Sequence, residues 1–223
     1  MSRSLLIPLA SALFLSDEQA MWRVQSQEDP HAFARLMDRW RKRVYGLCAR
    51  MTGDSHRAED LTQETFTRLF VHRKSYVPTA RFSTFLWRIA LNLCYDELRR
   101  VQRRGECSLD DPQGETSSLG EVLVDPEPAP DERLVQRERA ELVRTALLRL
   151  SETHRTALVL RHFEQLKFRE IAEVLEIPEG TVKSRMAEAM TQLNHHLNLL
   201  LRKESTPCKT ILNPNPPKVT QAR

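Results

Sequence analysis

Residues 82–104, FSTFLWRIALNLCYDELRRVQRR, are the stretch that most constrains the fold of this chain. Apolar residues recur at every third or fourth position and predict a helix with one buried face, made of Phe85, Leu86, Ile89, Ala90, Leu93 and Leu98. The opposite face is expected to be exposed and mostly cationic, and it comprises Trp87 or Tyr95 with Arg88, Asn92, Asp96, Arg99, Arg100 and Arg103. We expect Ser83 or Thr84 to cap the start of this helix and Gly105 to end it.

This cationic face has two interpretations. Arginine beside an exposed aromatic ring suits a partner that carries phosphates and stackable bases, which describes a nucleic acid. A solvated amphipathic helix explains the same pattern without any partner. The choice between them depends on the flanking segments.

Composition predicts an all-α protein, and the length leaves room for one large domain or two small ones. The 223 residues include only six glycines, and long periodic runs are rich in Leu, Ala, Arg and Glu. The net charge is only +4, but residues 105–132 contain nine acids and no Lys or Arg, together with several prolines. We therefore expect an acidic, flexible linker between two more basic domains that grip an anionic partner at two places.

The cysteines and the N-terminus indicate a cytoplasmic protein without a metal site. Cys48, Cys94, Cys107 and Cys208 form no Cys-x-x-Cys pair, and no histidine lies at zinc-finger spacing from them. Residues 1–15 resemble a weak signal peptide, but they lack a clear cleavage site before the charged residues that follow. We interpret them as a non-cleaved extension, and we expect no membrane contact and no cofactor.

The segment AEDLTQETFTRLF, residues 58–70, predicts a helix with an acidic outer face. Asp60, Gln63 and Glu64 fall on that face, whereas Leu61 and Phe66 point inward. Such a face can dock a basic protein surface, and ordinary solvation explains it equally well. Residues 72–81 follow without periodicity, and Pro78 excludes a helix there.

Residues 167–193 predict a helix-turn-helix. A short helix with Ala172 near its centre is followed by a turn at 176–178 and a second helix from Glu179. The second helix opens with small, hydroxyl-bearing and basic residues, the kind that reach base edges and phosphates in a major groove, namely Thr181, Lys183, Ser184 and Arg185. A plain helical hairpin is the alternative. Residues 203–223 are expected to be a disordered tail.

Two motifs together resemble bacterial RNA polymerase sigma factors of the extracytoplasmic-function (ECF) group. AEDLTQETFTRLF with FSTFLWRIALNLCYDELRR is similar to their region 2, and LSETHRTALVLRHFEQLKFREIAEVLEIPEGTVKSRM to their region 4. The resemblance implies a region 2 domain over residues 16–104, the linker over 105–132 and a region 4 domain over 133–202. It also implies core RNA polymerase (β′ clamp and β flap), promoter DNA and an anti-sigma factor as partners.

The resemblance assigns roles to individual residues. Binding of the polymerase clamp falls on Asp60, Leu61, Gln63 and Glu64. Recognition and melting of the minus-ten element fall on Tyr76, Phe82, Trp87, Asn92, Asp96, Arg99 and Arg100. Reading of the minus-thirty-five element falls on Thr181, Lys183, Ser184 and Arg185.

The chain departs from the family pattern at a few positions. Glu188 and Met190 stand where members often carry Arg, and Gln165 replaces a common Gly before the helix-turn-helix. An enzyme finds little support, because no nucleophile–base pair and no phosphate-binding loop is recognisable. An autonomous helix-turn-helix regulator is the main alternative, but it leaves the Arg-rich helix at 82–104 unexplained.

Overall fold

A computed structural model of the chain describes residues 15–77, 81–107 and 130–204, with only the backbone described for residues 105–107, 130–137 and 203–204. The predicted all-α class is confirmed: the regular elements within these ranges are all helical. The expected N-terminal extension, most of the linker and most of the tail lie outside the described residues. Every helix in the described part is too short or too polar to span a lipid bilayer.

The N-terminal half is a bundle of four helices and one short 3₁₀ turn. Side chains that cap the backbone determine where several of these helices begin. Ser16 and Gln19 form a reciprocal capping box at the first helix, and Asp29 and Asp54 cap the next two through their side chains. Gly53 ends the second helix with φ +76°, in the left-handed conformation that glycine adopts at little cost. The elements are α2 (Asp17–Gln27), α3 (Pro30–Thr52), α4 (Ser55–Val71), η1 (Arg73–Ser75) and α5 (Phe82–Cys107).

Helix α5 differs from its prediction at both ends. It begins at Phe82, ahead of the expected caps, and the Phe82 backbone N–H donates to the Glu18 carboxylate at 3.3 Å. Thr84 is therefore inside the helix and buried. At the other end the helix continues through Gly105 to Cys107, because glycine permits a left-handed end without imposing one.

The C-terminal half begins with α6 (Pro130–Leu148), three residues before the predicted domain boundary. Ser151 then caps α7 (Glu152–Leu158), which widens into a π-helical turn η2 (Val159–Phe163). The predicted helix-turn-helix is confirmed as α8 (Phe168–Leu175) and α9 (Glu179–Glu204). Glu176, with φ +56°, ends α8 in the left-handed conformation and starts the turn.

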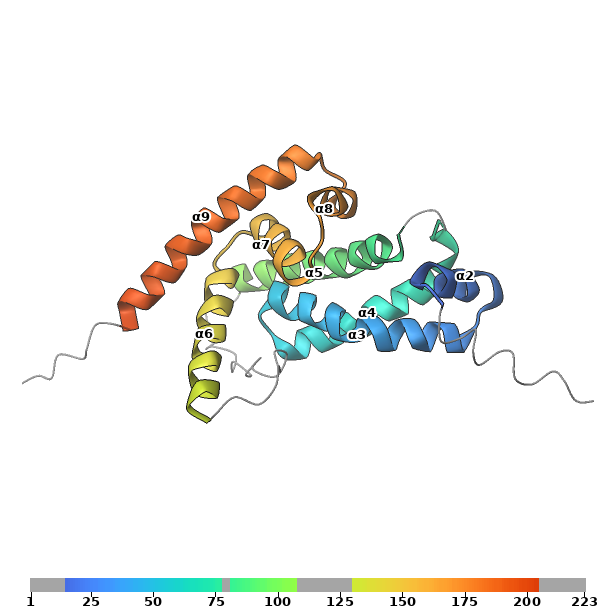
Figure 1. Cartoon of the computed structure of the whole chain (residues 1–223), viewed down its shortest axis with the longest axis horizontal. Coiled ribbons are helices and arrows are strands. Elements are labelled where there is room, and N and C mark those ends of the chain that lie inside the picture. Colours follow the sequence, from blue (N-terminus) through green and yellow to red (C-terminus); the bar gives the residue numbers. More distant parts are fainter. Residues whose placement is uncertain (1–14, 78–80, 108–129, 205–223) are drawn as a thin grey trace, which may run out of the picture.

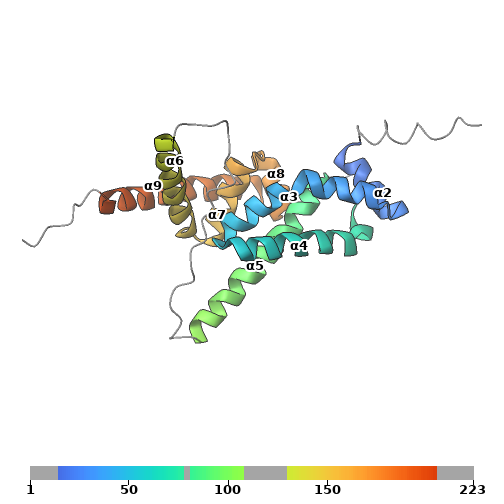
Figure 2. The ribbon, with the colours of Figure 1, turned by 90° about the horizontal axis from the view of Figure 1, so that it is seen from below.

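The two halves pack on each other and share a continuous hydrophobic core. Buried residues of η2, α8 and α9, among them Leu160, Ile171 and Val182, join the cluster formed by α2 to α5. Figure 1 shows α8 between α5 and the first turns of α9, and α6 beside the end of α3. Figure 2 shows the C-terminal half of α5 projecting away from the other helices. That projecting half carries many of the polar residues singled out by the sequence.

Candidate polymerase and nucleic-acid interfaces

The predicted acidic face of α4 is open to solvent. Asp60 and Gln63 are exposed, and the Glu64 side chain is 45% exposed. Arg68 donates to Glu64 at 2.8 Å, and Arg57 lies 3.9 Å from Asp60. These contacts lie within α4, so the carboxylates remain accessible to a basic partner. Leu61, the fourth predicted residue, is 8% exposed and lies at the inner edge of this face.

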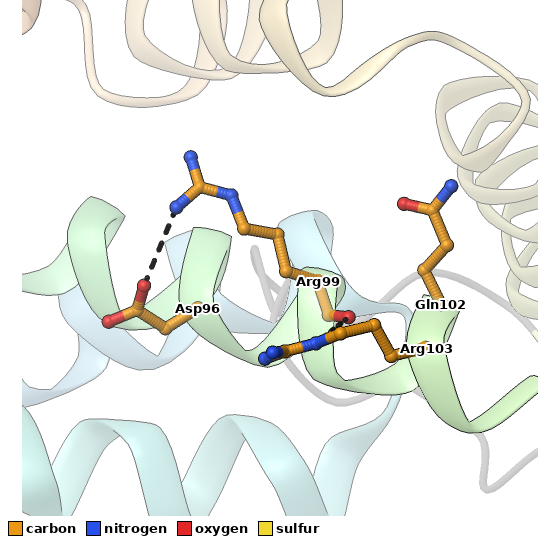
Figure 3. A pocket seen from close by; sticks show the side chains of 4 residues that line it. All are labelled: Asp96, Arg99, Gln102 and Arg103. Atoms are coloured by element: carbon orange, nitrogen blue, oxygen red, sulfur yellow. Dashed lines mark hydrogen bonds and ion pairs between the residues drawn. The ribbon is translucent and has the colours of Figure 1, made fainter.

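The exposed polar surface of α5 begins at Asn92 and continues toward its C-terminal end. Asp96 and Arg99 form an i,i+3 pair at 3.7 Å in which both side chains are about two-thirds exposed. With Gln102 and Arg103 they line a shallow hollow of about 560 Å³, shown in Figure 3. The hollow is mixed in charge, because one carboxylate stands among two guanidinium groups and an amide.

Arg100, also predicted to contact DNA, is tied into a network between α4 and α5. Its guanidinium donates to Glu97, with a shortest N–O distance of 2.8 Å. Arg57 of α4 lies 3.4 Å from the same carboxylate, which is only 11% exposed. The network holds α5 against α4, and it leaves the Arg100 side chain 42% exposed.

Of the two rings that were alternatives for the exposed face of α5, Trp87 is buried and Tyr95 is half-buried. Trp87 is fully buried, and so are Phe82 and, at 2% exposure, Tyr76. The rings form an edge-to-face cluster in which the ring centroid of Trp40 lies 5.6 Å from that of Trp87 and 5.7 Å from that of Phe82. Burial and the nearby carboxylate of Glu18 raise the pKa of Tyr76 to about 12. In this conformation the three predicted aromatics are core residues and offer no free ring face to a base.

The first turns of helix α9, where the sequence predicts contacts to DNA, are partly exposed. Lys183 and Ser184 are exposed, and Thr181 and Arg185 are half-buried. The Lys183 ammonium pairs with Glu179 at 2.8 Å, and the Ser184 hydroxyl donates to the Thr181 carbonyl at 3.1 Å. Both partners lie within α9, so a phosphate can replace them without unfolding the helix.

Arg185 brings the recognition helix close to α5. Burial raises the pKa of the Tyr95 hydroxyl, and the positive charge of Arg185 acts in the opposite direction. That hydroxyl also lies 2.9 Å from Thr156 Oγ1 of α7. The charge of Arg185 at the start of α9 therefore reaches the Tyr95 side chain of α5.

A set of charged contacts joins the two halves, and these contacts were not predicted from the sequence. On the N-terminal half they involve Arg43, Arg81 and Arg88, and on the C-terminal half Glu164, Glu170 and Glu176. The one signal in the sequence was Glu164, the only acid among residues 153–169. Among the described residues, no cluster of His, Cys, Asp or Glu has the grouping of a metal site.

Family models match both halves of the chain. Sigma-70 region 2 matches residues 36–104, and Sigma-70 region 4 matches residues 140–193. The ECF RNA polymerase sigma factor SigW of Bacillus subtilis strain 168 is 35% identical over 172 residues, covering 76% of this chain and 90% of that protein. The chain belongs to the ECF group of RNA polymerase sigma factors.

Other relatives agree with this membership. The RNA polymerase sigma-H factor of Pseudomonas aeruginosa is 32% identical over 187 residues, covering 83% of this chain and 96% of that protein. The fold resembles the sigma factor RpoE from Bartonella quintana, solved in complex with the anti-sigma factor NepR, with a TM-score of 0.58 and 22% identity over 75% of this chain and 97% of that one. As an ECF sigma factor the chain acts in transcription initiation by RNA polymerase, and the autonomous regulator is not favoured.

Proposed function

We propose that this sigma factor uses three separate surfaces to bind core polymerase, to open the minus-ten element and to read the minus-thirty-five element. The observation that carries the proposal is the exposed surface of α5, where Asn92, Asp96 and Arg99 follow one another toward the projecting end of the helix. Along the chain, this surface follows the acidic face of α4 and precedes the recognition helix α9, which is the order of the family motifs.

The acidic face of α4 is proposed to dock the polymerase clamp. Asp60 and Glu64 pair with arginines of α4 itself and Gln63 is exposed, so the face is available to a partner. Leu61 supports it from within the core. Exposed carboxylates attract a basic surface over a distance of about one Debye length, which favours rapid encounter.

The α5 surface is proposed to hold the separated non-template strand of the minus-ten element. Extruding a base costs a few kcal/mol, and contacts in the receiving pocket must offset that cost. Asn92 and Asp96 supply hydrogen-bonding groups, and Arg99 with Arg100 neutralises phosphates. Tyr76, Phe82 and Trp87 are proposed to shape this site from the core, because their rings are buried.

The first turns of α9 are proposed to enter the major groove of the minus-thirty-five element. Lys183 and Arg185 would meet phosphates or guanine edges, while Thr181 and Ser184 would donate or accept hydrogen bonds. Glu188 is exposed on the same helix and lies 3.1 Å from His154, so it does not add a cation to the grip on the DNA backbone.

The remaining expectations follow from this role. We propose that the protein is a specificity subunit without catalytic activity of its own, because the polymerase carries out the bond-forming chemistry. It is proposed to act in the cytoplasm, where the polymerase and promoter DNA are. An anti-sigma factor is the proposed restraint, by analogy with the complex known for the Bartonella quintana sigma factor.

Run-off transcription tests the proposal directly. Purified core polymerase with this protein should produce a transcript from the promoter region of its own operon. The transcript should disappear with Lys183→Glu/Arg185→Glu and persist with the control Arg139→Glu/Arg149→Glu, which reverses two exposed cations, one on α6 and one directly after it. Binding to duplex DNA without polymerase, together with no transcript and no co-elution with core, would reject the sigma role.

A further inference from the structure

One aromatic ring outside the three proposed surfaces is open to solvent. Trp22 of α2 is 48% exposed, whereas Trp40 and Trp87 are buried. Phe70, the other exposed aromatic among the described residues, has the guanidinium of Arg73 over its ring at 4.3 Å. Trp22 has no such cover, because no described residue forms a ring or cation–π contact with it. A large apolar surface that packing usually removes from water is thus accessible.

Helix α2 is held against the chain on both sides of the connection between α4 and α5. Gln25 Nε2 donates to the backbone carbonyl of Lys74 at 3.1 Å and to that of Tyr76 at 2.8 Å. Seven residues before Gln25, the Glu18 carboxylate accepts from the Phe82 backbone N–H at 3.3 Å. One side of α2 therefore contacts the chain shortly after α4 and again at the start of α5.

Trp22 lies on this side of α2. It is four residues after Glu18 and three before Gln25, and residues at those spacings are neighbours on a helix surface. A different side of the helix carries Met21 and Val24 into the core. The indole ring is therefore exposed where α2 borders the chain that enters the proposed melting helix.

The charges around Trp22 favour an anionic partner. Each of the three acids at the ends of α2 already has a partner, either an arginine or a backbone N–H; they are Asp17, Glu18 and Glu28. Lys74 is exposed, and none of the described residues forms an ion pair with its ammonium group. An exposed ring near a free cation suits single-stranded nucleic acid, whose bases stack on aromatic side chains and whose phosphates attract cations.

The surroundings of Trp22 favour an unpaired base over a protein partner. Gln19 and Ser26, its neighbours on the exposed side of α2, are polar and exposed, so the ring stands alone on this helix. Protein interfaces have an apolar core, whereas a single planar ring is sufficient to stack one base. Bases within a duplex already stack on each other, so the ring is suited to melted DNA.

We propose that Trp22 stacks on an unpaired base of the melted promoter strand and that Lys74 contacts a neighbouring phosphate. This inference rests on the proposed function, because it extends the minus-ten surface of α5 to α2. Phe82, which contacts α2, and Asn92 are ten residues apart in α5, or about 15 Å, which is roughly five bases at 3.4 Å each. Figure 2 shows α2 at the far end of the N-terminal half from the projecting end of α5. A strand held by the α5 surface thus reaches Trp22 by following α5 toward its start.

Three variants of the full chain, each assembled with core polymerase on the promoter of its own operon, test the stacking contact. Trp22→Leu keeps an apolar side chain without a ring, and Trp22→Phe keeps a ring. The control Leu199→Ala truncates an exposed apolar residue on the far part of α9. Trp22→Leu should shorten the half-life of the open complex under heparin challenge by roughly fivefold or more, which corresponds to about 1 kcal/mol of lost stacking. Trp22→Phe and Leu199→Ala should retain most of the wild-type half-life.

Photo-cross-linking identifies what the ring contacts. Iodouracil would be placed at single positions along the non-template strand, because it cross-links to an aromatic side chain that stacks on it. One position or two adjacent positions should cross-link to the peptide that carries Trp22, and Trp22→Leu should abolish this product. Co-elution with core polymerase should be the same for the wild-type chain and all three variants, since the proposed partner is DNA.

The possible results separate the stacking site from the sigma function. An unchanged half-life for Trp22→Leu, or no cross-link to Trp22 at any position, would overturn the stacking site. Weaker co-elution of Trp22→Leu with core polymerase would also overturn it, because Trp22 would then contact protein. No transcript from the wild-type chain would instead overturn the sigma function on which the proposal rests.

Discussion

Arg43 Nε lies 3.0 Å from Glu164 Oε2 across the boundary between the two halves of the molecule, and the Glu164 side chain is only 3% exposed. Residues 121 positions apart are thus joined by an ion pair whose carboxylate is buried. Taking a carboxylate out of water costs several kcal/mol, and the pairing offsets that cost only while both partners are present. The pair therefore predicts an asymmetry between variants of its two members.

Arg43→Ala should destabilise the protein more than Glu164→Gln. Removing the arginine leaves a buried carboxylate, with a loss of roughly 2–3 kcal/mol, toward the low end for buried pairs because Arg43 itself is 43% exposed. Glutamine keeps an oxygen that accepts from Arg43, and it removes the buried charge. Urea unfolding of the full chain measures both variants, and an equal loss for the two would show that the carboxylate is not effectively buried.

The pKa of Glu164 predicts the direction of a pH effect. Burial raises this pKa above its ordinary value of 4.5, against the opposing charges of Arg43 and Arg50. The folded state then binds the proton more tightly than the unfolded state, so the contribution to stability is fully present below pH 4.5 and is lost as pH rises through the raised pKa. The Glu164→Gln variant lacks this titrating carboxyl group, so its stability does not change with pH for this reason.

Unfolding free energies measured at several pH values test this effect. The wild-type chain should gain stability relative to Glu164→Gln as pH falls from neutral toward 4.5. The other carboxylates are present in both proteins, so their titration cancels in the difference. A difference that stays constant over this range would mean that the Glu164 pKa is not raised in the folded state.

Arg155 should be one of the least replaceable side chains in the molecule. Its guanidinium donates to the carbonyls of Leu147, Leu148 and Leu150 as well as Met51, and so joins the end of α6 to the end of α3. The single ammonium group of Arg155→Lys cannot donate to all of these carbonyls. The buried carbonyls left unpaired should lower the free energy of unfolding in urea by about 2–3 kcal/mol. The exposed control Arg149→Lys should change stability by less than about 0.5 kcal/mol.

Two glycines make a matched pair. Gly53 has φ +76°, and an added Cβ would lie 2.6 Å from Leu148 Cδ1 of α6, so Gly53→Ala should cost at least about 1–2 kcal/mol. A Cβ on Gly180 would meet nothing within 4 Å, and Gly180→Ala should be neutral or stabilise α9 by up to about 1 kcal/mol. The midpoint temperature of thermal unfolding should therefore fall for Gly53→Ala and stay the same or rise for Gly180→Ala. A lower midpoint temperature for Gly180→Ala alone would contradict the assignment of the left-handed turn.

The sequence was sufficient for the helices and their ends where local chemistry decides them. Ser16, Asp54 and Gly53 act through neighbours within a few residues, and hydrophobic periodicity placed α8 and α9. The burial of Trp87 was open to prediction, because Leu91 and Cys94 follow it at four and seven positions and are also buried. The apolar stripe of α5 is wider than one face because α5 packs against α2, α3 and α4 on one side and α8 on another.

The association of the two halves was beyond sequence patterns. Arg43, Arg81 and Arg88 look like ordinary solvated cations in their own helices, and their partners lie 85 or more residues away. Periodicity records that a face is polar, and it carries no information on which distant acid will meet it. The residues that contact DNA or polymerase remain predictions for the same reason, since their partners are outside the chain.

Asn92 offers the sharpest test of the proposed melting surface. Asn92→Ala removes an exposed amide, so the fold should be intact, but a flipped base would lose a hydrogen bond worth about 1 kcal/mol, which is about fivefold in open-complex formation. Binding of the closed complex, which depends on duplex contacts, should change much less. The control Asn198→Ala, on the exposed far part of α9, should leave both steps unchanged. Permanganate footprinting and filter binding separate the two steps, and an equal loss in both would remove Asn92 from the melting site.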